Sequence, residues 1–248
     1  MTDSSGREAQ HARLIHREVQ QLAVLIAVAV IAFFATRALA EQTRDMRRAD
    51  AAVWFTRAEQ ALSSGRVAEA LRMYRRAAAR DPVSTSYKLG LARALAADGQ
   101  GAAAVEALLA LRDVEPENPD VNTELARLTA RAGDAQAAVR YYQSALSALW
   151  RSSDREHRRT LRLEMIRFLM ARGQPLRAVP DILTLSTNLP PDATWHTRVG
   201  LLLLEVDEPE RALALFNEAL AVDPSDTDAR AGASRARALI AIKDRPEH

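Results

Sequence analysis

The segment "GRVAEALRMYRRAAARDP", Gly65 to Pro82, recurs along the chain. From Gly99 the sequence reads "GQGAAAVEALLALRDVEP", and from Gly133 it reads "GDAQAAVRYYQSALSALW". Each copy begins with a glycine 34 residues after the previous one and has alanine sixth and a bulky residue tenth. A constant interval of this length predicts a series of similar helical hairpins.

Other positions keep the same interval. The small residues in step are Ala58, Ala92 and Ala126, and then Ala70, Ala104 and Ala138. The bulky residues in step are Tyr74, Leu108 and Tyr142. Two later copies follow, with Gly173, Ala178, Ile182 and Pro190 in one and Gly200, Asp207, Ala212, Phe216 and Pro224 in the other. The step from Gly133 to Gly173 is forty residues, so about six residues are inserted near "RSSDREHRR", 151–159.

This pattern resembles the tetratricopeptide repeat family, whose 34-residue unit is a helix–turn–helix. The closest match is "WFTRAEQALSSGRVAEALRMYRRAAARDP", 54–82. The resemblance implies an all-α fold, an α-solenoid of about five repeats closed by a capping helix within 225–248. The repeats are expected near 51–84, 85–118, 119–152, 159–192 and 193–226.

Elementary packing explains the repeated residues. Alanines allow the two helices of a hairpin to approach closely, and Gly65 and its equivalents end a helix where a left-handed residue is needed. Pro82 and its equivalents set the turn between units. No hairpin can bury its apolar face alone, so Tyr74 and its equivalents are expected to be buried between hairpins.

The composition agrees with a helical protein that buries a core. Of 248 residues, 48% are hydrophobic and only 9 are glycine, while alanine, leucine and arginine dominate. The absence of cysteine excludes disulfides and thiolate metal sites. A net charge of +2 does not supply the clustered basic face that nucleic-acid binding requires. Lys88 and Lys243 are the only lysines, a bias that we interpret as bacterial origin.

The N-terminal part predicts a membrane segment. "LAVLIAVAVIAFFAT", 22–36, has no charged side chain, and the apolar stretch extends to Ala40. We expect 1–21 to be a basic tail, 22–40 a single transmembrane helix and 41–50 a charged linker. The alternative is a signal peptide cleaved after Ala40, because "ALA" at 38–40 has the small-x-small form. Arginines flank both sides of 22–40, so topology stays open; we expect an inner-membrane protein with an extracytoplasmic array.

The family resemblance also implies a concave surface lined by the first helix of each pair. A row of arginines falls there, and apolar residues surround it. The candidate partner-binding residues are Arg93, Arg127, Arg131, Arg167, Phe55, Leu89 and Leu163. Guanidinium groups in a row would bind carboxylates or phosphates of an extended partner. The alternative is that the arginines pair with Glu124, Glu164 or Glu205 of the chain itself.

The inserted 151–159 run is a basic loop or helix extension, or a contact for a partner or anionic lipid. Trp150 and Trp195 flank it and are expected to repack the irregular junction. The five histidines form no metal-binding pattern, and no phosphate-binding loop or nucleophile motif is present. We therefore expect no catalytic residue, metal or cofactor.

Three functions fit these observations. The first is a membrane-tethered scaffold or adaptor that recruits protein partners of a cell-envelope complex. The second is a permanent, non-catalytic subunit of a membrane enzyme or secretion complex. The third, if the chain is cleaved after Ala40, is a soluble exported binding protein.

Overall fold

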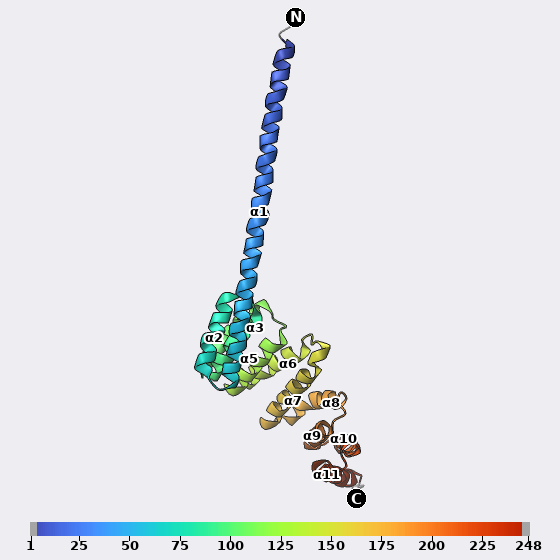
Figure 1. Ribbon diagram of the computed structural model, residues 1–248. Coiled ribbons are helices and arrows are strands. Elements are labelled where there is room, and N and C mark those ends of the chain that lie inside the picture. Colours follow the sequence, from blue (N-terminus) through green and yellow to red (C-terminus); the bar gives the residue numbers. More distant parts are fainter. Residues whose placement is uncertain (1–3, 245–248) are drawn as a thin grey trace. The chain divides into compact units, whose positions relative to one another are not determined.

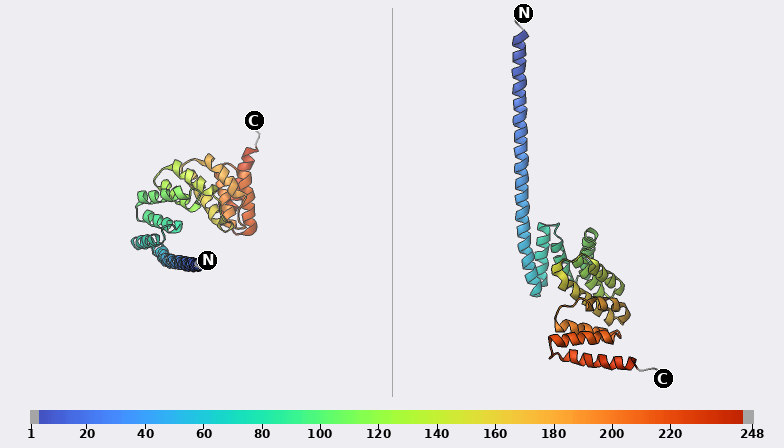
Figure 2. Two further views of the ribbon diagram at one scale, coloured as in Figure 1. Left: turned by 90° about the horizontal axis from the view of Figure 1, so that it is seen from above. Right: turned by 90° about the vertical axis from the view of Figure 1, so that its right-hand side faces the viewer.

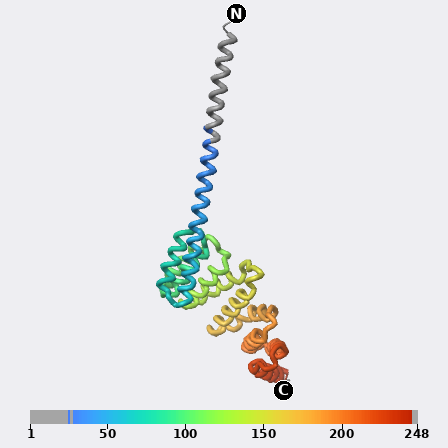
Figure 3. The backbone as a smooth tube through the Cα atoms, viewed as in Figure 1, coloured from blue at the N-terminus to red at the C-terminus, as the bar shows by residue number. Residues whose placement is uncertain are grey.

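A computed structural model describes the backbone of residues 4–244 and the side chains of Leu25 and residues 28–244 (Figure 3). Within this part of the chain, all regular structure is helical: eleven α-helices and one short 3-10 turn, with no strand. The all-α prediction is confirmed. The chain divides into two compact units, residues 1–99 and 100–248, each described separately below.

The first unit contains a long helix and two short ones (Figure 1). They are α1 (Ser4–Ser63), α2 (Val67–Arg80) and α3 (Thr85–Ala97). The C-terminal end of α1 packs on α2, and α2 packs on α3. The expected linker, 41–50, lies inside α1, so the helix reaches the first hairpin without interruption.

The predicted membrane segment, 22–40, lies on α1. Of its residues, the side chains of 22–24, 26 and 27 lie outside the described set, as do those of the basic tail, 1–21. Within the described set, large apolar side chains such as Ile31, Phe33 and Leu39 are exposed. No helix among the described residues is long and apolar enough to span a bilayer.

The second unit is a stack of shorter helices (Figure 2). They are α4 (Gly101–Val114), α5 (Pro119–Arg131), α6 (Ala135–Ser147), α7 (Arg155–Ala171), α8 (Pro175–Ser186), α9 (Ala193–Glu205), α10 (Pro209–Val222) and α11 (Thr227–Lys243). The packed pairs are α5 with α6, α7 with α8, and α9 with α10, while α4 packs on α5. The predicted capping helix is α11, which covers α9 and α10.

The number of repeats differs from the five predicted. Four of the predicted helix–turn–helix pairs lie within one unit and pack together: α1 with α2, α5 with α6, α7 with α8, and α9 with α10. The predicted repeat 85–118 would pair α3 with α4, but these helices fall on opposite sides of the division at Gly99.

The turns inside the pairs have the expected left-handed residue. Gly65, Gly133 and Gly173 have φ values of 73°, 87° and 66°. At each, the amide of the following residue donates to a carbonyl five positions earlier, as in Arg66 N–H to Ala61 O at 2.8 Å. Asp207 holds the equivalent place in the last pair with φ 61°, and it is the one non-glycine residue with positive φ in the described chain.

The repeated bulky residues form the core, as predicted. The side chains of Tyr74, Leu108, Ile182 and Phe216 are fully buried, and Tyr142 is 2% exposed. The repeated alanines beside them are also fully buried. Because these side chains fill space between successive helices, each repeat has a large apolar or aromatic residue at this position, although the residue type differs between repeats.

The inserted residues extend a helix. Ser152–Asp154 form a single 3-10 turn that leads directly into α7, which starts at Arg155. Trp150 donates its indole N–H to Ala145 O at 2.8 Å and lies 5.4 Å from the His157 ring. This tryptophan therefore anchors the junction to α6, as expected of a repacking role.

Candidate partner-binding surface

Arg127, the central arginine of the predicted row, is held by the chain itself. From α5 it donates to both carboxylate oxygens of Glu164 on α7, with Nε–Oε1 3.0 Å and Nη2–Oε2 2.8 Å. Its Nη1 also lies 3.3 Å from Glu124 Oε1. The hydrogen bonds to Glu164 raise the pKa of Arg127 above its ordinary value. Two helices are thus joined by a fork-shaped, charge-assisted contact.

Tyr142 of α6 completes this network. Its hydroxyl donates to Glu164 Oε1 at 2.8 Å, and burial followed by the Glu164 charge raises the pKa of the phenol. Burial alone would raise the pKa of Glu164, but hydrogen bonds from Arg127 and Tyr142 outweigh burial and lower it. The carboxylate therefore stays ionised at neutral pH and ties together α5, α6 and α7.

The other three arginines differ in setting. Arg131 and Arg167, on α5 and α7 of the second unit, have exposed side chains. The positive charge of Arg131 contributes to the low pKa of Glu164. Arg93 is half-buried on α3 of the first unit, where its charge acts on Tyr74. Arg131 and Arg167 are therefore the predicted basic residues most open to a partner.

The predicted apolar residues are mostly used for packing. Leu89 and Leu163 are 7% and 3% exposed, so their side chains belong to the interior of their units. Phe55 is half-buried, with its ring centroid 5.8 Å from that of Tyr74 and 5.1 Å from that of Tyr87. Of the three, only Phe55 offers an apolar surface to a partner.

Residues 61–128 match the sequence profile of the tetratricopeptide repeat. This part of the chain carries tetratricopeptide repeat sequence. Among solved structures it is similar to the pilF protein of Pseudomonas aeruginosa, with a TM-score of 0.57, 15% identity, and coverage of 81% of this chain and 87% of that one. It is also similar to yeast Tom70, with a TM-score of 0.58, 14% identity, and coverage of 80% and 41%.

A third similar structure is a MamA protein, with a TM-score of 0.52, 15% identity, and coverage of 71% of this chain and 92% of that one. At such identities the likeness concerns the fold. No curated protein sequence matches the chain. The comparisons therefore show a tetratricopeptide-like fold. They do not identify a partner, which has to be inferred from the surface residues.

Sequence reasoning missed the carboxylates that hold the repeat tyrosines. In the first unit, the Tyr74 hydroxyl donates to Glu59, just as Tyr142 donates to Glu164 in the second. The signal was present, because a buried phenol at a repeated position needs an acceptor from a neighbouring helix. These contacts join α1 to α2 in the first unit and α6 to α7 in the second.

The described residues contain no group of three or more histidine or acidic side chains placed to hold a metal ion. What the surface offers instead is a set of arginine side chains on helices, two of them exposed. Such groups bind anionic surfaces through hydrogen bonds and do not provide a nucleophile with a neighbouring base. The arrangement is suited to recognition of another molecule.

Proposed function

We propose that the protein is a membrane-tethered scaffold that binds other proteins of a cell-envelope complex through its tetratricopeptide repeats. One observation carries the proposal: the helix that bears the apolar 22–40 sequence is the same helix that forms the first repeat hairpin. Stacked repeats present extended binding surfaces, and a long apolar stretch favours insertion in a bilayer. A binding surface and a tether on one continuous helix suit a recruiting role.

The tether would hold the chain in the inner membrane as a single-pass protein, with the repeats on the extracytoplasmic side. Cleavage after Ala40 would instead release a soluble binding protein. The intact mass of the chain isolated from its native cell distinguishes these forms, because cleavage removes the first forty residues. Extraction of the uncleaved chain only by detergent would support the tether.

Partner binding is assigned to the exposed cations of the second unit, Arg131 and Arg167, with acidic partners favoured by their charge. The test is crosslinking in cells, followed by purification of the full chain and identification of stoichiometric partners. The double variant Arg131→Glu/Arg167→Glu should lose the partner and keep its helical content. A matched control is Arg72→Glu/Arg75→Glu, the same charge change at exposed positions on α2.

Equal capture by the Arg131→Glu/Arg167→Glu variant and the unmodified chain would refute the assignment of these two arginines. If no protein is captured in stoichiometric amount, the scaffold proposal itself fails. A partner that remains bound at high salt would favour a permanent subunit, because exposed ion pairs weaken as salt screens them.

A further inference from the structure

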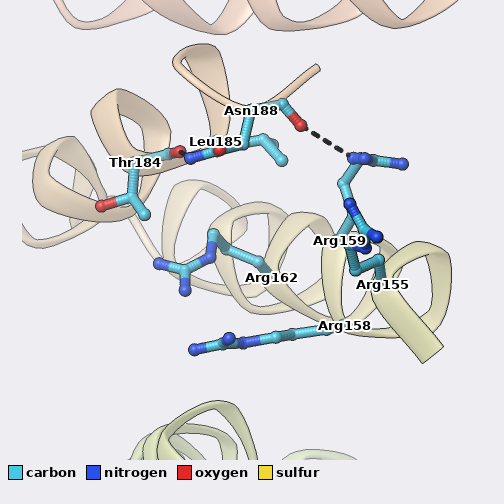
Figure 4. Close-up of a pocket in the computed structure, with 7 residues that line it drawn as sticks. All are labelled: Arg155, Arg158, Arg159, Arg162, Thr184, Leu185 and Asn188. Carbon is cyan, nitrogen blue, oxygen red and sulfur yellow. Dashed lines mark hydrogen bonds between the residues drawn. The ribbon is translucent and has the colours of Figure 1, made fainter. Parts of the chain in front are cut away.

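The first turns of α7 and the end of α8 form a pocket rich in arginine (Figure 4). It encloses about 250 Å³ and is open to solvent on one side. The lining residues are Arg155, Arg158, Arg159, Arg162, Thr184, Leu185 and Asn188. Four cations, one apolar side chain and the end of a helix thus line one small cavity.

The four arginines share one face of α7. They are spaced three, four and seven residues apart, which places side chains on the same side of a helix. From Arg155 to Arg162 this row covers about 10 Å along the helix axis. The cations therefore form a line rather than a single point of positive charge.

Two arginines of the row are fixed in place. Arg162, with a side chain 15% exposed, bonds Asp181 Oδ1 on α8 at 2.7 Å. Arg159, 17% exposed, donates to Asn188 O at 3.1 Å, pairs with Glu156 and lies over the Trp195 ring at 5.7 Å. Both guanidinium groups are ordered before any ligand arrives, which lowers the entropic cost of binding.

The other two arginines are exposed and have spare hydrogen-bonding capacity. Arg155 donates to Ser152 O at 3.2 Å, and Arg158 has no acidic partner among the described residues. Figure 4 shows Arg158 and Arg162 extended in the same direction on one side of the pocket. Burial and the neighbouring Arg158 charge both lower the pKa of Arg162.

The charges in the pocket do not balance. Among the residues that the structure describes, the ion pairs of the four arginines involve two carboxylates, those of Glu156 and Asp181, so two positive charges are left over. Crowded like charges destabilise each other, and an anion placed between them would relieve the repulsion. The pocket therefore has an excess of positive charge that an anionic ligand would neutralise.

We propose that this pocket binds an extended, acidic segment of a partner protein. In an extended chain, alternate side chains lie on one face about 6.6 Å apart, so two carboxylates fit along a row of about 10 Å. A single phosphate would reach only part of that row. Leu185, 3% exposed, forms part of the pocket wall and offers little apolar surface, so the arginines provide the main contacts.

This inference rests on the proposed scaffold function and adds a site to it. The pocket is not a position that the repeat itself provides, because Arg155 and Arg158 belong to the residues inserted before the repeat that starts near 159. A 34-residue unit without the insertion would begin this helix after these two positions. The insertion therefore gives this chain a binding feature of its own.

The test measures binding of two fluorescent peptides to the purified full chain by anisotropy. One peptide alternates glutamate and leucine, and the other replaces each glutamate with glutamine. The acidic peptide should bind, and Arg155→Gln/Arg158→Gln should weaken its binding about tenfold or more. The control Arg235→Gln/Arg237→Gln, with the same charge change at exposed positions on α11, should leave binding unchanged.

Several outcomes would overturn the inference. They are equal binding of the neutral peptide, equal loss in the α11 control, and no binding of the acidic peptide. Binding of inorganic phosphate or of phosphatidylglycerol vesicles that depends on Arg155 and Arg158, without peptide binding, would reassign the pocket to another anion. If crosslinked partners are still captured when the peptide fails, the scaffold proposal stands and only the pocket assignment falls.

Discussion

Replacing Gly232 with alanine should destabilise the cap, although alanine is the better helix former. Phe216 is fully buried between α9 and α11, facing Gly200 on one side and Gly232 on the other. A Cβ added at Gly232 would lie 2.5 Å from Cε1 and 2.8 Å from Cε2 of the Phe216 ring. Ordinary carbon contacts are about 3.5–4.0 Å, so the ring or α11 must move by about 1 Å.

The ring cannot retreat toward α9. A Cβ at Gly200 would already be 2.8 Å from the same ring, so the space on that side is also filled. Overpacking of this kind costs about 1–3 kcal/mol, and the upper half of the range applies because both sides are closed. The higher helix propensity of alanine offsets about 1 kcal/mol of this loss in stability. We expect a net loss of about 1–2 kcal/mol.

The assay is urea unfolding followed by circular dichroism, with hydrogen exchange of α11 amides as the local readout, because repeat arrays can unfold in parts. The matched control is Gly101→Ala at the start of α4, where no heavy atom lies within 4 Å of the added Cβ. It should be neutral or stabilising by up to about 1 kcal/mol. The variant Phe216→Leu/Gly232→Ala should lose less than the sum of its single changes.

Stability of Gly232→Ala equal to or above that of the unmodified chain would refute this packing argument. Equal losses in Gly232→Ala and Gly101→Ala would also refute it, because the effect would then come from helix backbone rather than from the Phe216 ring.

Three further changes test other parts of the fold. In a double-mutant cycle read by urea unfolding, Arg127→Ala and Glu164→Ala should show a coupling of about 1–2 kcal/mol; an additive result would contradict it. Asp226 accepts two amides at the start of α11 and, chiefly through the amide of Ala229, has a lowered pKa. Asp226→Ala should cost about 1 kcal/mol at pH 7, a difference that persists above the ordinary aspartate pKa and fades as the pH falls through the lowered value. A pH-independent difference in thermal unfolding would exclude the charged cap. Gly133→Ala, at φ 87°, should lose about 1–2 kcal/mol, and an unchanged urea midpoint would show that the left-handed turn carries no strain.

The repeated part of the fold could be predicted from the sequence because each prediction depended on one kind of residue that recurs at the same place in successive repeats. A glycine at a fixed place predicted a left-handed turn, and Gly65 and Gly173 have positive φ. A bulky residue at a fixed place predicted burial, and Tyr74 and Phe216 are fully buried. The same alignment placed Asp207 at a turn, where aspartate adopts the conformation of glycine.

The candidate site could be predicted only in part, because side-chain pairing depends on contacts between helices far apart in sequence. The sequence suggested, as an alternative, that the arginines pair with Glu124, Glu164 or Glu205, and the structure shows Arg127 paired with Glu124 and Glu164. The third member, Tyr142, was assigned to packing alone. The pocket beside Arg158 was not foreseen either, since it needs the end of α8 to lie against the inserted residues.

Because α1 continues unbroken from Ser4 to Ser63, it fixes both the distance and the angle about the helix axis between the apolar 22–40 stretch and α2. Each residue of an α-helix advances about 1.5 Å and turns about 100°. One residue inserted within 41–50 would rotate the apolar 22–40 stretch by about 100° about the helix axis relative to α2, while moving it by only about 1.5 Å. Seven inserted residues would nearly restore the angle and add about 10 Å. The number of residues in α1 therefore sets the angle at which the first hairpin faces relative to the apolar stretch.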